Sequence, residues 1–523
     1  MSQNDNTLQR IISVVQEKLN DFLQLDDLGH LVIIDPVDKK LISSDYAQSH
    51  CAVSFLLSDE SYVIEKGVSM VKALLTTWLD DIKIPSFHFD FNNLALCIAE
   101  NRLAKLSIET ELQEQIRSIV INTQDSIHDT VNWLPMRYYV NYKRYEWTKN
   151  REYKSRMTKI RAMIDQAIWD DGFIDDRSKK GISFNLQYNL ATVAMMEFIN
   201  EELQSEEFNI YKCVNALIQT LLPDGDINYL GRGCNQVFAW GLWLYLLKAT
   251  GQNQYYKDSL EYLSKRIDTA IDNNNLMLNE CNGNDKYLWW DYHYSSVYMA
   301  HLCMWLRLTQ MLQDKPDCSY KQKAEYGSDS GVRIQRFASS TVSIFLGRES
   351  YLAERGPVVS ALCTQKHGVI FKGGFAPWQG AFGNKYTHIL PAMYGFCGLL
   401  NIKTNSRIMD NRFFRRLNLY IPVAAKAEVT PLFVPIQAEE NDGCVEIYFQ
   451  NTKRKLCQFN VPIFSECNID RAEIEVFADE DRVHVFETGA IHTQYGMSKL
   501  WQTQPYKARV WRLRILAERE WSV

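Results

Sequence analysis

The chain has 523 residues, of which 46% are hydrophobic and 23% are charged, and its formal net charge is -6 at pH 7. These values are typical of a globular protein with two or more domains and a large core. They exclude a strongly basic surface, so we expect neither nucleic acid nor an anionic membrane surface as a partner.

No run of about 18 apolar residues occurs, so the sequence predicts no transmembrane helix. Residues 1–24 are polar and then amphipathic, without the basic and apolar regions of a signal peptide. We therefore expect a cytoplasmic protein.

Twelve cysteines are scattered along the chain, and no two of them form a C-x-x-C pair. This spacing argues against a zinc site or a disulfide framework and favours reduced, mostly buried thiols. His88-x-Asp90 and Tyr292-His293 lack a convincing third and fourth ligand. We expect no metal and no cofactor.

Helical periodicity recurs through the first 312 residues. It predicts helices at 7–24, 62–80, 94–103, 107–121, 151–168, 207–221, 237–247 and 254–272, one through Met195 and Phe198, and one that ends near Leu312. Polar and aromatic residues cluster before every second helix, near residues 48, 91, 137, 187, 235 and 293.

These clusters recur at intervals of roughly 43 to 58 residues, the range of a helix-pair repeat. We therefore predict about six helical hairpins. If the hairpins close into an (α/α) toroid, its apolar helices form the inside and all six polar loops lie at one mouth. An open solenoid is the alternative, and we favour the closed ring because the loops carry the polar chemistry.

The pattern changes after about residue 320. A polar linker at 314–323 is followed by short apolar or alternating runs separated by Gly, Pro and Asn. These runs predict strands at 341–346, 368–371, 444–450, 472–477, 483–487 and 508–515, and residues 476–485 predict a hairpin. The chain is thus expected to be α+β and multidomain, with a helical toroid at 1–320 and an antiparallel β-sandwich at 330–523.

The six clusters contain mainly amides, phenols, imidazoles and guanidinium groups, whereas carboxylates are few and dispersed. The side chains are those of Tyr46, His50, His88, Asp90, Asn92, Asn93, Arg137, Asn185, Gln187, Tyr188, Asn189, Tyr229, Arg232, Asn235, Gln236, His293, Tyr294 and Tyr298. A glycoside hydrolase normally needs two carboxylates that flank the bond. A lyase acting on a uronic acid instead needs Asn, Gln, Arg or His to neutralise the substrate carboxylate, and Tyr or His to transfer protons. The clusters match the lyase set better.

A helical toroid followed by an antiparallel β domain resembles the heparinase II/III-like, alginate and chondroitin lyases. The resemblance is carried by Gln187-Tyr188-Asn189, by residues 229–236, by Tyr292-His293-Tyr294 with Tyr298, and by 353–357 through Gly373-Gly374. It implies a carbon–oxygen lyase that cleaves an acidic, uronic-acid-containing polysaccharide or oligosaccharide, in bacterial capsule or exopolysaccharide metabolism.

The resemblance also implies roles for individual residues. Tyr188, His293 and Tyr294 would transfer protons, Asn189 or Asn185 would neutralise the substrate carboxylate, and Arg232 and Gln236 would bind substrate anions. The other implied substrate-binding residues are Gln187, Tyr229, Asn235, Tyr298, His88, Asn92, Arg137 and Trp290.

Other interpretations stay open at this point. The same toroid would suit a glycoside hydrolase that uses Asp90, Asp226 or Asp291, or a non-catalytic glycan-binding or assembly protein. Tyr188 and His293 have structural interpretations as a boundary aromatic and a helix cap. Arg232 would serve equally well in an ion pair with Asp226 or Asp291, and we assign His301 to packing.

Overall fold

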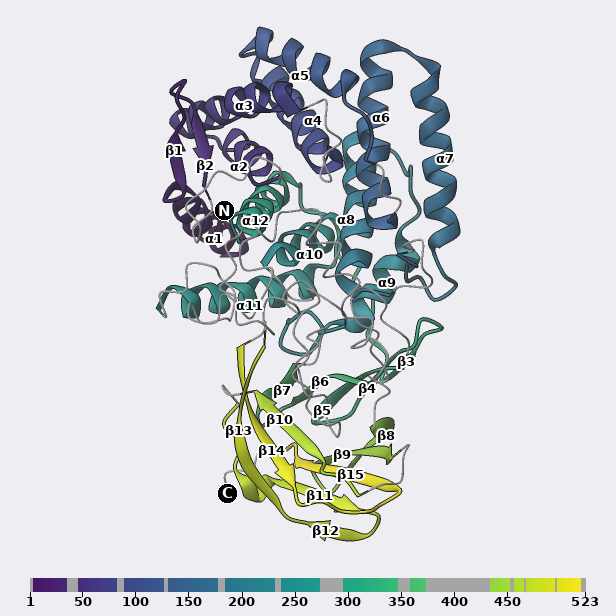
Figure 1. The fold of residues 1–523 in the computed structure, drawn as a ribbon. Coiled ribbons are helices and arrows are strands. Elements are labelled where there is room, and N and C mark those ends of the chain that lie inside the picture. Colours follow the sequence, from purple (N-terminus) through teal and green to yellow (C-terminus); the bar gives the residue numbers. More distant parts are fainter. Residues whose placement is uncertain are drawn as a thin grey trace.

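The computed structural model describes most of the chain. The described residues are 3–34, 46–81, 89–126, 130–176, 184–230, 237–272, 295–346, 358–372, 433–451, 456–464, 467–493 and 496–518. They form an α+β structure with helices in the N-terminal part and antiparallel sheets in the C-terminal part (Figure 1).

Twelve α-helices lie in the described ranges. The even-numbered helices are α2 (Ala47–Leu56), α4 (Phe89–Leu106), α6 (Leu134–Thr148), α8 (Leu186–Leu203), α10 (Val237–Ala249) and α12 (Ser295–Met311). The odd-numbered helices are α1 (Gln3–Asn20), α3 (Ser61–Asp81), α5 (Thr110–Asn122), α7 (Arg151–Ala167), α9 (Tyr211–Thr220) and α11 (Asn253–Asp272). A 3-10 turn, η1 (Val131–Trp133), precedes α6.

The two sets differ in burial because they occupy different layers. Every residue of α2 is buried, whereas α1 buries only the face formed by Leu8, Ile11, Ile12, Val15 and Leu19. An amphipathic helix covers a core with one stripe, and a helix that is apolar on all sides must be surrounded. The even-numbered helices are accordingly the inner layer and the odd-numbered ones the outer layer (Figure 1).

The inner helices close into a ring. Each inner helix packs against the next from α2 to α12, and α12 packs against α2. The closed arrangement, rather than the open solenoid, is therefore the one observed. The pairing differs from the prediction in one respect, because the outer partner of α12 is α1 and not a helix that follows it. Arg10 of α1 also pairs with Asp268 of α11, at 2.6 Å, which joins the first and last outer helices.

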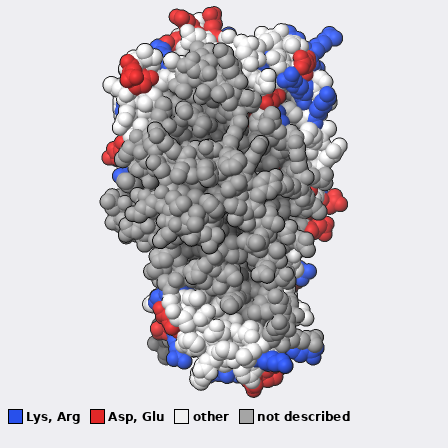
Figure 2. Space-filling model, in the orientation of Figure 1, with Lys and Arg blue, Asp and Glu red and all other residues white. Residues whose placement is uncertain are grey.

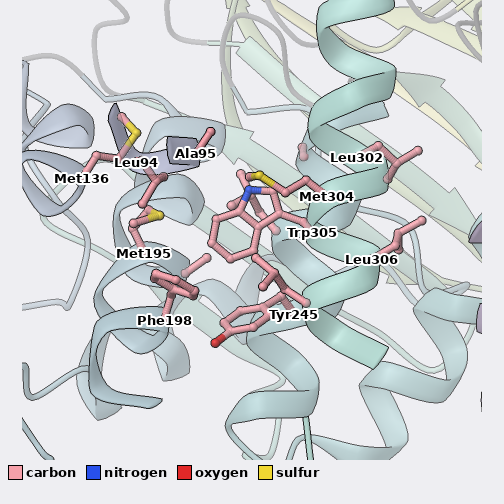
Figure 3. Close-up of a cluster of buried hydrophobic side chains, with 14 of the residues drawn as sticks. Leu94, Ala95, Met136, Met195, Phe198, Tyr245, Leu302, Met304, Trp305 and Leu306 are labelled. Atoms are coloured by element: carbon pink, nitrogen blue, oxygen red, sulfur yellow. The ribbon is translucent and has the colours of Figure 1, made fainter. Parts of the chain in front are cut away.

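Large apolar side chains fill the inside of the ring (Figure 3). Trp305 of α12 is 1% exposed and lies edge-on to Phe198 of α8 and Tyr245 of α10, at centroid distances of 5.8 and 5.0 Å. Met136 of α6 and Leu94 of α4 complete this cluster from the other side. The interior is thus a packed core and not a channel.

We expect the substitution Gly241→Val to destabilise the ring. A Cβ atom at Gly241 of α10 would lie 2.8 Å from the Cβ of Trp305 and 3.1 Å from the carbonyl oxygen of Leu302. Overpacking of a core costs about 1–3 kcal/mol of unfolding free energy. Denaturant titration measures this loss. Gly327→Val is the matched control because nothing lies within 4 Å of that position, and equal losses in both variants would contradict the packing argument.

The strands form antiparallel sheets. A two-stranded hairpin of β1 (Leu23–Leu25) and β2 (Leu31–Ile33), which the sequence did not predict, follows α1. The predicted helix at 7–24 was therefore wrong at its end, because α1 stops at Asn20 and residues 23 and 24 pair with β2. The C-terminal strands are β3 (Glu325–Gly327), β4 (Val332–Arg336), β5 (Ser340–Phe345), β6 (Val358–Thr364), β7 (Gly368–Lys372), β8 (Phe433–Asn441), β9 (Cys444–Asn451), β10 (Asn460–Phe464), β11 (Ile474–Ala478), β12 (Asp481–Val483), β13 (Val485–Thr493), β14 (Gly496–Thr503) and β15 (Val510–Leu516).

These C-terminal strands are ordered β3-β4-β5-β6-β7, β12-β11-β15-β9-β8 and β10-β14-β13. The predicted hairpin is confirmed, with Val476 opposite Val483 and Asp479 in the left-handed conformation at its turn. Two boundaries were wrong. Residues 471–473 form a 3-10 turn before β11, and the run at 483–487 is divided between β12 and β13.

One apolar core is shared by the three C-terminal sheets. Val342 of β5, Ile447 of β9, Val461 of β10 and Trp511 of β15 belong to the same buried cluster. The described part of the β region is therefore a packed unit of antiparallel sheets. The β-sandwich and the exact domain boundaries stay predictions, since residues 373–432 lie outside the described ranges.

The first β-sheet packs against loops of the helical part. Phe345 of β5 stacks on Phe184, which directly precedes α8, at a centroid distance of 5.3 Å. Asn228 donates a hydrogen bond of 3.0 Å to the hydroxyl oxygen of Ser343. These contacts place β5 and β6 beside the loops that lead into the inner helices.

Candidate functional site

The N-terminal ends of the inner helices meet at one end of the ring, which we call the mouth. Tyr46, just before α2, stacks on Phe91 of α4 at 4.4 Å, and Phe91 meets Trp133 of η1 edge-on at 5.3 Å. Phe238 of α10 lies 4.9 Å from Tyr298 of α12. The ring contacts therefore join the first turns of α2, α4 and η1 in one group and those of α10 and α12 in another.

Aromatic side chains in these first turns are partly exposed. Phe91, Tyr188, Phe238 and Tyr298 are half-buried, one each on α4, α8, α10 and α12, whereas most residues around them are buried. A flat aromatic face that remains accessible among buried neighbours can stack on the apolar face of a sugar ring. Tyr188 and Tyr298 were predicted as site residues, and Phe91 and Phe238 were not.

Several buried polar atoms in the same turns have no hydrogen-bond partner among the described residues. They are Asn92 Nδ2, both amide atoms of Asn93, Asn132 Oδ1, Gln187 Nε2 and Ser296 Oγ. An unsatisfied buried donor or acceptor costs about 1–3 kcal/mol. A polar ligand that supplies partners for these atoms would remove that cost. Asn92 and Gln187 were predicted as substrate-binding residues.

Arg137 forms a buried ion pair with Asp90. Its guanidinium donates to Asp90 Oδ2 at 2.9 and 3.2 Å, and both side chains are nearly inaccessible. Burial raises the pKa of Asp90, and the charge of Arg137 opposes that rise. The pair links α4 to α6, so the predicted substrate-binding residue Arg137 has a structural partner.

The start of α8 is organised by two asparagines. Asn185 is the N-cap, and its side-chain oxygen accepts hydrogen bonds from the backbone N–H groups of Gln187 and Tyr188 at 3.0 and 3.2 Å. The Asn189 amide accepts from Ile174 N at 2.5 Å and donates to the carbonyl oxygens of Ile174 and Asn185, both at 3.0 Å. Both predicted site asparagines therefore hold the backbone around Tyr188.

Asp176 is a buried carboxyl group that the sequence analysis missed. It follows Asp175, and its Oδ1 accepts a hydrogen bond of 3.1 Å from the backbone N–H of Asn132 at the mouth. Burial raises the pKa of Asp176 to about 6. The two consecutive carboxylates between α7 and α8 were the available signal.

A second buried carboxyl group, Asp226, lies beside the β region. Its Oδ2 accepts hydrogen bonds from the hydroxyl groups of Tyr229 and Tyr262, at 2.5 and 2.7 Å. The ammonium of Lys372 lies 5.6 Å from the ring centroid of Tyr229. Burial raises the pKa of Asp226 to about 6, with a further rise from Asp224. The hydroxyl of Tyr229, a predicted substrate-binding residue, is thus held by Asp226 inside the fold.

We expect the stability difference between the wild type and Asp226→Asn to depend on pH. The folded pKa of about 6 lies above the ordinary value of 3.8. The folded state therefore holds this proton more tightly, and raising the pH through this interval lowers wild-type stability relative to the variant. Thermal unfolding of both proteins between about pH 4 and pH 7 measures the effect. A stability difference that stays constant over this range would contradict the shifted pKa.

His301 of α12 is part of the apolar packing, as the sequence indicated. It is 5% exposed, its ring lies 5.1 Å from that of His50, and its Nε2 accepts from Trp305 Nε1 at 3.2 Å. Burial lowers the pKa of His301 to about 3, so the imidazole is neutral near pH 7.

The remaining predicted site residues lie outside the described ranges. They are His88, Arg232, Asn235, Gln236, Trp290, His293 and Tyr294, and the alternative carboxylate Asp291 is among them too. Their roles stay predictions.

The described residues have four further features. No three His, Cys, Asp or Glu side chains lie together in a way that suits a metal ion. The nine cysteines in these ranges are free and most are buried, as predicted. No helix there combines the length and apolarity that a bilayer crossing requires. On the face drawn in Figure 2, acidic and basic side chains are interspersed on the described surface.

No known family model and no curated protein matches the chain. Among solved structures it is similar to a polysaccharide lyase, with 12% identity over 60% of this chain and 100% of that chain and a TM-score of 0.39. It is also similar to an α-1,6-mannanase from Salegentibacter, with 10% identity over 58% of this chain and 99% of the mannanase and a TM-score of 0.38. A third similar structure is an unsaturated glucuronyl hydrolase from Streptococcus agalactiae, with 8% identity over 60% of this chain and 94% of the hydrolase and a TM-score of 0.39.

Proposed function

We propose that the chain is a carbon–oxygen lyase that cleaves an acidic, uronic-acid-containing polysaccharide by β-elimination at the mouth. The observation that supports this best is the gathering, in the first turns of the inner helices, of partly exposed aromatic side chains and of buried amides that have no hydrogen-bond partner among the described residues. Aromatic faces suit sugar rings, and amide N–H groups suit the carboxylate of a uronic acid.

Tyr188 is the residue to which we assign proton transfer in this proposal. Its side chain is half-buried at the start of α8, and the adjacent Gln187 amide nitrogen has no partner among the described residues. Gln187 would neutralise the substrate carboxylate, while Asn185 and Asn189 hold this turn in place. His293, Tyr294, Arg232 and Gln236 retain their predicted roles in the proposal.

A glycoside hydrolase is the second candidate, and Asp176 favours it. A buried carboxyl group with a pKa of about 6 at the mouth is suited to act as a general acid. Asp90 and Asp226, the carboxylates first considered for this role, are held by Arg137 and by two tyrosine hydroxyls. Asp176 is therefore the better hydrolase candidate.

The test incubates the purified full chain with a panel of uronic-acid polymers and neutral polysaccharides. The lyase proposal expects new reducing ends together with the ultraviolet absorbance of an unsaturated uronic acid. Reducing ends without that absorbance, lost in Asp176→Asn, would establish the hydrolase instead. Saturable binding without any product would contradict both enzymes and leave a glycan-binding protein.

A further inference from the structure

A cavity lies at the other end of the ring from the mouth. Its volume is about 860 Å³, and residues near the C-terminal ends of α8, α10 and α12 line it. Glu197 and Glu201 are nine and thirteen residues after Tyr188 on α8, which corresponds to roughly 14–20 Å along the helix. A volume of about 860 Å³ is within the range of small-molecule sites. The distance along α8 separates the cavity from the proposed glycan site.

The charge of the cavity lining is negative. The lining contains five carboxylates and two ammonium groups, those of Glu197, Glu201, Glu202, Glu206 and Asp314 and of Lys105 and Lys315. A third ammonium group, that of Lys248, lies 3.6 Å from Asp314. A cavity with this balance favours a cationic ligand and disfavours the polyanion proposed for the mouth.

The structure already places a primary ammonium in this cavity. Lys315, from the segment after α12, lies 3.5 Å from the Glu197 carboxylate and forms an ion pair with Glu201. The Glu197 side chain is 9% exposed, and its other oxygen accepts from Asn200 at 3.1 Å. The Lys315 side chain is 38% exposed. Two carboxylates on one helix therefore form an ammonium site that an external amine could enter by displacing Lys315.

Apolar and aromatic groups also line the cavity. Tyr245 and Phe208 contribute to the lining and are buried. Tyr211 and Met311, also in the lining, are 61% and 47% exposed and are therefore accessible to a ligand. Aromatic faces bind ammonium groups, and apolar side chains cover the methylene groups between them.

We propose that this cavity binds an aliphatic di- or polyamine, with one ammonium group between Glu197 and Glu201 in the place of Lys315. Its methylene chain lies against Tyr211 and Met311, and a second ammonium group pairs with the remaining carboxylates. This site is independent of the reaction at the mouth.

Isothermal titration calorimetry of the full chain with spermidine tests the proposal. We expect one spermidine molecule to bind per chain. Titration with NaCl or MgCl₂ at equal ionic strength should give no comparable binding heat. Glu201→Gln removes a charge-assisted interaction and should weaken binding about 10-fold or more. Lys315→Ala removes the internal competitor and should tighten it. Glu114→Gln, an exposed position on α5, is the matched control and should leave binding unchanged.

Two results would overturn the proposal. One is the same affinity in Glu201→Gln, Glu114→Gln and the wild type, which would indicate non-specific attraction to an acidic protein. The other is weaker or unchanged binding in Lys315→Ala, because that partly exposed side chain occupies the proposed ammonium site. Neither result bears on cleavage at the mouth, which is measured separately.

Discussion

Tyr188→Phe is expected to lower kcat for the cleaved polysaccharide about 10²–10⁴-fold, the usual contribution of a positioned acid or base. The substitution removes only the hydroxyl oxygen, and the half-buried ring can still stack on a sugar. The dissociation constant for an oligosaccharide product should therefore change little. Initial rates and calorimetry on the same preparation measure the two effects separately.

The control for this prediction is Tyr62→Phe. Tyr62 is 60% exposed on the outer helix α3, so its hydroxyl should not affect the rate. Full activity in Tyr188→Phe would exclude Tyr188 as the acid or base. A loss of binding as large as the loss of rate would assign Tyr188 to substrate recognition instead.

Arg137→Met is expected to lower the free energy of unfolding by about 3–5 kcal/mol, because it leaves the buried Asp90 carboxylate without its cation. Burial already raises the pKa of Asp90, and loss of Arg137 should raise it further. The loss of stability should therefore be smaller at low pH, where Asp90 is protonated. Urea titration at two pH values measures both effects.

Two further variants test whether the loss of stability arises because the ion pair is buried. Arg156→Met removes an exposed pair with Glu152 on α7 and should cost less than about 1 kcal/mol. Asp90→Asn in the Arg137→Met background should recover part of the stability, since no charge is left unpaired. A loss in Arg137→Met no larger than that in Arg156→Met would contradict the account of the pair.

The candidate site was only partly predictable from the sequence. The residue types around Gln187, Tyr188 and Tyr298 indicated a polar and aromatic mouth, and these residues lie in the first turns of α8 and α12, two inner helices of one ring. The partners of Asn189 and Arg137 were not predictable, because Ile174 and Asp90 lie 15 and 47 residues away along the chain. Asp176 was missed because its raised pKa comes from burial, and the burial of this side chain depends on the tertiary structure.

The sequence alone determined most of the helices, their alternation between apolar and amphipathic types, and the change to short strands after residue 320, but it did not assign α6. These features depend on periodicity and turn residues within about ten neighbours, so they can be read locally. The tertiary structure decided the closure of the ring through α1 and α12, the order of the strands and the acidic cavity. Each of these depends on contacts between distant segments, whose free energy comes from shared burial that no single segment encodes.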